Sequence, residues 1–132
     1  AAGNLARSQT QICGGQSFPP APPMTMNRFA RYAARIHSRD MARRAFFEHI
    51  NPDGQDFAFR MRQTGYLGGL PWGENIAAGD RTGEGVVQSW INSPGHCRNL
   101  MNPSFRVVGL GYAELEGSPF TRYWTQTFGA SD

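Results

Sequence analysis

The chain contains no lysine. All thirteen of its basic residues are arginine, and a cluster of them falls at positions 28, 31, 35, 39, 43 and 44. Such a run is typical of a surface for phosphate or lipid head groups or, more simply, of the solvated face of a helix. Asp40 and Glu48 interrupt the run, and the formal net charge at pH 7 is only +3. We therefore favour the solvated face and expect no nucleic-acid partner.

Long apolar runs are also missing. No stretch approaches the roughly 18 consecutive apolar residues that a membrane-spanning helix needs, so we expect no transmembrane segment. The first residues, from Ala1 to Asn4, do not resemble the apolar core of a signal peptide. An export signal would have to be already removed or to precede residue 1.

Cysteine is scarce, since Cys13 and Cys97 are the only two. They form no C-x-x-C unit and have no partner cysteines for a zinc site. These residues favour a disulfide between them, with two buried free thiols as the alternative. A disulfide would indicate a place outside the cytoplasm, because such bonds persist in oxidising compartments.

The remaining composition is that of a globular protein, with 39% hydrophobic residues in 132. This length fits one domain over residues 1–132 and leaves little room for two. A domain of this size buries about two-thirds of the surface of its unfolded chain, which is enough for a real core.

The longest helix is predicted to begin at about residue 26 and to end near Phe46 and Phe47, because apolar residues recur there at three- and four-residue steps. Thr25 or Asn27 can cap its start, because both side chains accept hydrogen bonds from backbone amides. Asp56 is expected to cap a second helix that ends at Gly65.

Shorter helices are predicted in three places, over residues 4–12, 83–92 and 94–102. Ser93 is expected to cap the last of these, with proline in its first turn. Residues 65–81 indicate an ordered loop or a short strand. Alternating apolar residues over 105–113 and 120–128 predict an antiparallel hairpin. Helices first and strands last indicate an α+β fold with helices packed on a sheet.

Several familiar active sites are excluded by their missing motifs. The chain has no G-x-S-x-G, no P-loop and no H-E-x-x-H. Three histidines and scattered carboxylates remain. His37 falls on the apolar face of the long helix, which favours a core or rim position. His49, Glu74 and His96 fall at turns and helix ends, where two imidazoles and a carboxylate suit general acid/base chemistry or a divalent metal. From sequence alone, residues in such places are more often hydrogen-bonded structural groups than ligands.

Four separated motifs make the chain recognisable. They cover residues 46–54 around His49, 73–79 around Glu74, 90–103 around His96, and 123–129. Together they resemble the bacterial branch of the CAP superfamily, which is named for cysteine-rich secretory proteins, antigen 5 and pathogenesis-related proteins. The resemblance runs from about residue 4 to the end, in the family's order.

The resemblance implies a three-layer α-β-α sandwich with a small antiparallel sheet, in a secreted or periplasmic protein. It also implies a central cleft lined by histidine and glutamate. His49 matches the first cleft histidine, Glu74 the first cleft glutamate, and His96 the histidine of a bacterial Ser-Pro-Gly-His motif. The edge of the cleft is expected to hold three further residues, Asn75, Ser93 and Tyr123.

Two positions depart from the eukaryotic pattern of the family. Ser93 stands where that pattern has a second glutamate, and Tyr123 where it has a second histidine. The set of two histidines and two glutamates is therefore incomplete. A divalent metal such as zinc, held by His49 and His96, is expected to bind weakly.

Three classes of function follow from these observations. The favoured one is an exported binding domain whose cleft holds a small molecule, lipid or peptide, with cell-surface or envelope components as further partners. The alternative is a protease- or nuclease-like hydrolase that uses His49, Glu74 and His96, with or without a metal. The third class is an interaction module whose polar cluster only holds loops together.

Overall fold

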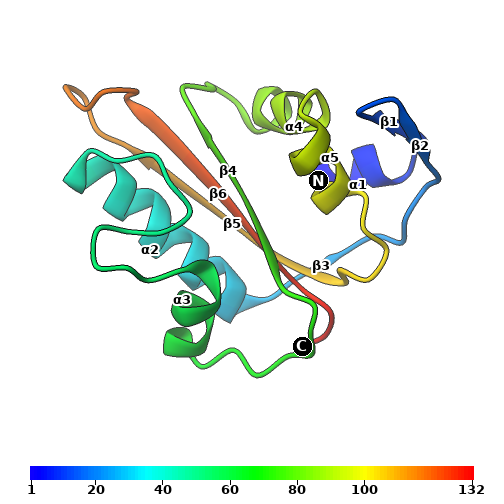
Figure 1. Cartoon of the computed structure of the whole chain (residues 1–132), viewed down its shortest axis with the longest axis horizontal. Helices are drawn as coiled ribbons and strands as arrows, with labels where there is room; N and C mark the ends of the chain where they lie inside the picture. The colour runs from blue at the N-terminus through cyan, green and yellow to red at the C-terminus, as the bar shows by residue number, and fades with distance from the viewer.

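A four-stranded sheet lies between two helical layers in the computed structural model, which describes residues 1–132 (Figure 1). The helices are α1 (Ala2–Arg7), α2 (Arg28–Arg44), α3 (Phe57–Thr64), α4 (Gly83–Ile91) and α5 (Pro94–Leu100). The strands are β1 (Gln11–Cys13), β2 (Gln16–Phe18), β3 (Thr25–Met26), β4 (Gly73–Ala78), β5 (Val107–Glu114) and β6 (Arg122–Gly129).

The central sheet has the strand order β3-β5-β6-β4. β5 and β6 pair antiparallel, with Tyr112 opposite Trp124, which confirms the predicted hairpin. β4 also pairs antiparallel with β6, with Glu74 opposite Thr127. The two-residue strand β3 was not predicted, and because it pairs parallel with β5 the sheet is mixed. β3 and β4 form its two edges.

The two faces of the sheet carry different helices. α2 packs on β5 and β6, with α3 beside it, while α4 and α5 contact β4 from the opposite layer, next to α1 (Figure 1). In that opposite layer, Trp90 and Val86 of α4 share a buried cluster with Trp124 and Phe128 of β6. The predicted α-β-α sandwich is therefore confirmed.

Two glycines of β5 allow α2 to rest directly on the sheet. A Cβ atom at Gly109 would overlap the backbone at Ala30 and Arg31, and one at Gly111 would overlap the backbone at Ala34. The missing side chains therefore set the distance between helix and strand, a close approach that only glycine permits.

The predicted cap of α2 at Asn27 and both predicted ends of α3 are confirmed, while α2 ends at Arg44, before the expected end near Phe46, because Ala45 adopts the left-handed conformation. Asn27 Oδ1 accepts from the backbone amides of Phe29 and Ala30, and Asp56 Oδ1 accepts from that of Phe59. Gly65 ends α3 in the left-handed region with a φ of 96°, as expected of a helix C-terminus.

The prediction of a helix over residues 4–12 is wrong beyond Arg7. Gly14 and Gly15 both have positive φ, which builds a tight turn and pairs β1 with β2 in a separate hairpin. The disulfide between Cys13 and Cys97, which is confirmed, fastens this hairpin to α5. Among the helices, none has the length and apolar character required to cross a bilayer.

Candidate functional site

The two helical layers meet around the edge strand β4, and the candidate site lies there. Glu74 belongs to β4 itself, His49 to the loop between α2 and α3, and His96 to α5 of the opposite layer (Figure 1). The site is thus assembled from three segments that are far apart in the sequence.

Glu74 forms the buried base of the site. Its Oε1 accepts from His49 Nδ1 at 2.8 Å, and its Oε2 accepts from Arg60 Nη2 at 2.8 Å. The side chain of Glu74 is 1% exposed and that of Arg60 is 4% exposed. Both carboxylate oxygens are therefore engaged, and the negative charge is paired inside the protein.

Arg60 also fixes the loop that carries His49. It donates to the backbone carbonyl of His49 at 2.9 Å and to that of Gln55 at 3.0 Å. Arg60 was not predicted as a site residue. The signal was a glutamate in a strand that is otherwise uncharged, because a buried carboxylate needs a cationic or hydrogen-bonding partner.

The imidazole of His49 is held in one tautomer. A carboxylate only accepts hydrogen bonds, so Nδ1 of His49 carries the proton that it donates to Glu74. When the ring is neutral, Nε2 is an acceptor, and the side chain that carries it is 48% exposed. This arrangement orients the ring and makes Nε2 available to a proton or to a ligand group that donates.

His96 is held by Ser93, whose Oγ lies 2.8 Å from His96 Nδ1. Burial lowers the pKa of His96, and a positive charge on the neighbouring His49, when that ring is protonated, lowers it further. The two rings are therefore close enough to interact electrostatically, and His96 is neutral at neutral pH. The expected cap is corrected here: Ser93 occupies the N-cap position of α5, but its hydroxyl bonds the histidine ring and caps no backbone amide.

Asn75 lies inside the site and ties the two layers together. It is fully buried and donates from Nδ2 to the carbonyl of His96 at 3.2 Å. Asn99 of α5 donates to Asn75 Oδ1 at 3.1 Å and to the carbonyl of Glu74 at 3.3 Å. The Asn99 side chain of α5 thereby occupies one backbone carbonyl of the edge strand β4.

Tyr123 is also buried, in a cluster with Met41, Ala42 and Ile76. Its hydroxyl accepts from the backbone amide of Phe120 at 3.1 Å. The ring lines an apolar hollow of about 180 Å³, whose other walls are Ala45, Phe46, Phe47, Pro119 and Phe120. Phe47 precedes His49 by two residues, so their Cα atoms are at most about 7 Å apart.

His37 lies in the core behind this loop and is fully buried. Its Nε2 donates to the carbonyl of Glu48 at 2.8 Å, and its Nδ1 has no hydrogen-bond partner in the protein. Burial lowers the pKa of His37 despite the opposing influence of Glu74. A neutral His37 therefore supports the loop next to His49.

The donor set does not fit a zinc centre with three protein ligands. Both oxygens of Glu74 are engaged, and the chain forms no group of three or more histidine, cysteine, aspartate or glutamate side chains with the geometry to hold a metal. Only the Nε2 atoms of His49 and His96 remain, whereas a catalytic zinc takes three protein ligands.

The whole arrangement matches a known family. The model of the CAP family, described as the cysteine-rich secretory protein family, matches residues 20–128, and the chain belongs to this family. The Bacillus subtilis protein YkwD is 38% identical to the chain over 106 residues, which are 80% of the chain and 39% of YkwD.

Solved structures agree with this assignment. An extracellular protein containing an SCP domain from Bacillus anthracis superposes with a TM-score of 0.70 at 31% identity, over 83% of this chain and 34% of that one. An outer surface protein from Borrelia burgdorferi superposes with a TM-score of 0.74 at 17% identity, over 85% of this chain and 80% of that one, and so shares the fold. The chain thus spans about a third of the Bacillus anthracis protein and two fifths of YkwD.

Proposed function

We propose that the chain is an exported binding domain, and that His49 and His96 receive the polar head of a small amphipathic molecule. The observation that carries this proposal is the acceptor Nε2 of His49, half-exposed and fixed by Glu74, two residues from an apolar hollow. A location outside the cytoplasm is supported by the disulfide and by the extracellular and outer surface relatives.

The chemistry of the two parts defines the ligand class. A neutral imidazole with a proton on Nδ1 accepts at Nε2, so the head of the ligand is a donor such as a hydroxyl, an amine or a peptide N–H. The hollow is lined by Phe47, Phe120 and Tyr123 and accommodates a short apolar segment. A small molecule, a lipid with a hydroxyl head, or a peptide with an aromatic side chain satisfies both.

Octanol is a suitable probe, with its methyl ether as the matched probe that lacks the donor. We expect octanol to shift the ring resonances of His49 and Phe120 together, while the ether shifts those of Phe120 alone. His49→Gln is expected to weaken octanol binding about fivefold, the value of roughly one hydrogen bond, and to leave ether binding unchanged. Tyr32→Phe, on the outer face of α2, is the control. If octanol shifted the resonances of neither ring, the proposal would be contradicted.

Hydrolysis is the second candidate, favoured by the contact between Ser93 Oγ and His96 Nδ1. A hydroxyl within hydrogen-bond reach of a neutral imidazole is the beginning of a nucleophile–base pair. His49, oriented by Glu74, resembles the oriented base of a hydrolase. Treatment with a fluorophosphonate followed by peptide mass spectrometry tests this candidate. A covalent adduct on Ser93 that His96→Gln abolishes would support it, and an unmodified Ser93 would contradict it.

A further inference from the structure

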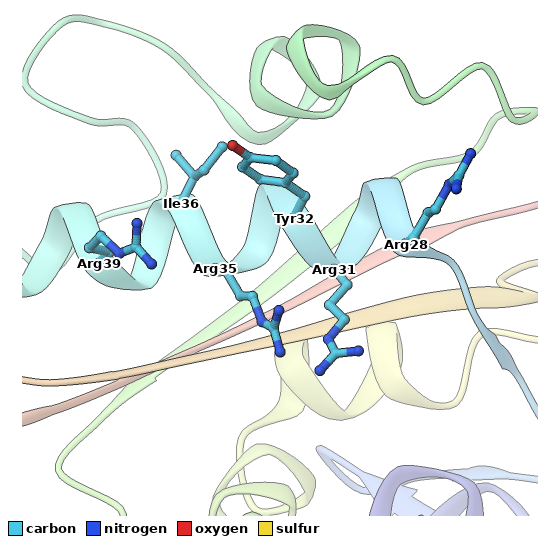
Figure 2. A pocket seen from close by; sticks show the side chains of 6 residues that line it. All are labelled: Arg28, Arg31, Tyr32, Arg35, Ile36 and Arg39. Atoms are coloured by element: carbon cyan, nitrogen blue, oxygen red, sulfur yellow. The ribbon is translucent and has the colours of Figure 1, made fainter.

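Four arginines form a continuous stripe on the outer face of α2. Arg28, Arg31, Arg35 and Arg39 are all exposed and line a shallow groove of about 310 Å³ (Figure 2). Between Arg28 and Arg39 the helix rises about 16 Å. We call these four residues the arginine stripe.

The charge of the arginine stripe is not neutralised within the protein. None of its members takes part in an ion pair. Asp40, the only acidic residue of α2, is paired with Arg44, which also contacts Asp53. A solvated helix face commonly mixes both signs, whereas this one presents four unpaired positive charges in a row.

Two large side chains lie within the groove. Tyr32 is 60% exposed and Ile36 is 39% exposed. Figure 2 shows Arg31 and Arg35 pointing to one side of α2, and Tyr32 and Ile36 pointing to the other. The face therefore combines cationic groups with a tyrosine and an aliphatic side chain, the residue types that sit at the level of lipid head groups.

All the residues that line the groove come from α2, so the groove has no opposing wall. A single polyanionic chain is usually enclosed by cationic groups on both sides of a groove that tracks its backbone. A single open stripe on the exposed face of one helix can instead engage many charges of a plane at once. We propose that the arginine stripe docks the protein on the surface of a bilayer that contains anionic lipids.

This docking surface is separate from the histidine pair and goes beyond the proposed function. The stripe binds phosphate groups of lipid heads through the guanidiniums, which form strong charge-assisted hydrogen bonds with them. Tyr32 and Ile36 enter the head-group layer from the same helix. Docking in this orientation leaves the opposite layer, with α4 and α5, facing away from the membrane.

Sedimentation with vesicles tests the proposal on the full chain. The vesicles contain one part phosphatidylglycerol to two parts phosphatidylcholine, and vesicles of phosphatidylcholine alone are the reference. We expect binding to the anionic vesicles only, with a loss at high salt because the exposed charges are screened. Each arginine close to an anionic surface is expected to strengthen binding on the order of fivefold.

A pair of charge-matched variants locates the surface. Arg31→Gln with Arg35→Gln is expected to weaken binding roughly 25-fold. Arg81→Gln with Arg98→Gln is expected to leave binding nearly unchanged, because these exposed arginines lie just before α4 and on α5. Circular dichroism and the melting temperature verify that both variants fold. Equal losses in both variants, or no binding to anionic vesicles, would overturn the proposal. Soluble polyphosphate that binds the stripe as tightly as the vesicles do would overturn it in favour of a soluble polyanion.

Discussion

Arg60 and Glu74 form a buried ion pair, with Arg60 Nη2 2.8 Å from Glu74 Oε2, and the same carboxylate holds His49 through its other oxygen. The pair connects α3 to the edge strand β4 directly behind the exposed imidazole. Neither charge has access to bulk water, so each depends on the other for its stability.

Removing one member of this pair is expected to be costly. Arg60→Met leaves the carboxylate of Glu74 buried without its cation, and a loss of about 3–5 kcal/mol in the free energy of unfolding is expected. The double variant Arg60→Met with Glu74→Met removes both charges and is expected to recover much of that loss. Urea denaturation of the parent, Arg60→Met, Glu74→Met and the double variant measures the coupling. A single variant as stable as the parent would show that the pair contributes nothing.

The disulfide is the second testable element, because it joins a two-stranded hairpin to α5 across 84 residues of sequence. Closing a loop of that length restricts the unfolded chain and is expected to stabilise the fold by at most about 4–5 kcal/mol. Cys13→Ser with Cys97→Ser is expected to lower the melting temperature. Reductant is expected to lower it in the parent and to leave it unchanged in the double variant. Melting curves with and without reductant distinguish the bond from the two substitutions.

Local chemistry predicted several features of this fold. The caps at Asn27 and Asp56 and the stop at Gly65 depend on a few neighbouring residues, so they are readable from sequence. The β5–β6 hairpin follows from alternation of apolar residues. The strands β1 and β2 have three residues each and β3 has two, which is too short for any periodicity to be seen.

Buried charge was the other feature that the sequence did not reveal. Arg7 is fully buried and donates to the carbonyls of Pro22, Leu100, Asn102 and Phe105. Its acceptors lie up to 98 positions away, so nothing near Arg7 indicates its role. The same holds for Arg60, since an arginine is expected on the surface unless its partners are known. The site residues themselves were named by resemblance to the family, and their roles remain proposals.

Stability is expected to decrease on acidification. Burial lowers the pKa values of both His37 and His96 below the ordinary value of 6.5. The unfolded chain therefore binds more protons than the folded one at acidic pH, and the free energy of unfolding rises with pH there. The full contribution of these two histidines to stability is present above their pKa in the unfolded chain. It is lost as pH falls toward their lowered pKa values in the folded protein.

Melting temperatures between about pH 5 and 8, where histidine titrates, measure this dependence. His96→Gln removes one titrating ring, so the dependence of the melting temperature on pH is expected to become weaker in part. His37→Gln removes the other ring, which is the fully buried one. Replacement of His49 provides a third curve for comparison. A melting temperature that rises on acidification across this range would contradict the expectation, because it would require the folded state to bind more protons than the unfolded one.

Ser93 is expected to act on His96 and to have little effect on the stability of α5. Its hydroxyl bonds the imidazole Nδ1 and caps no backbone amide, so Ser93→Ala is expected to change the free energy of unfolding by less than about 0.5 kcal/mol. Thr82 is the matched control, because its hydroxyl accepts from the backbone amide of Gly85 at the start of α4. Thr82→Ala is expected to lower stability by about 1 kcal/mol.

The ring of His96 provides the second measurement for Ser93→Ala. Without the hydroxyl, Nδ1 loses the partner that fixes the orientation of the ring, and the ring resonances and their titration are expected to shift. Thr82→Ala is expected to leave these resonances in place. If Ser93→Ala lowered stability as much as Thr82→Ala and left the His96 titration unchanged, Ser93 would be a helix cap in solution. The contact with the imidazole would then have no part in orienting the candidate site.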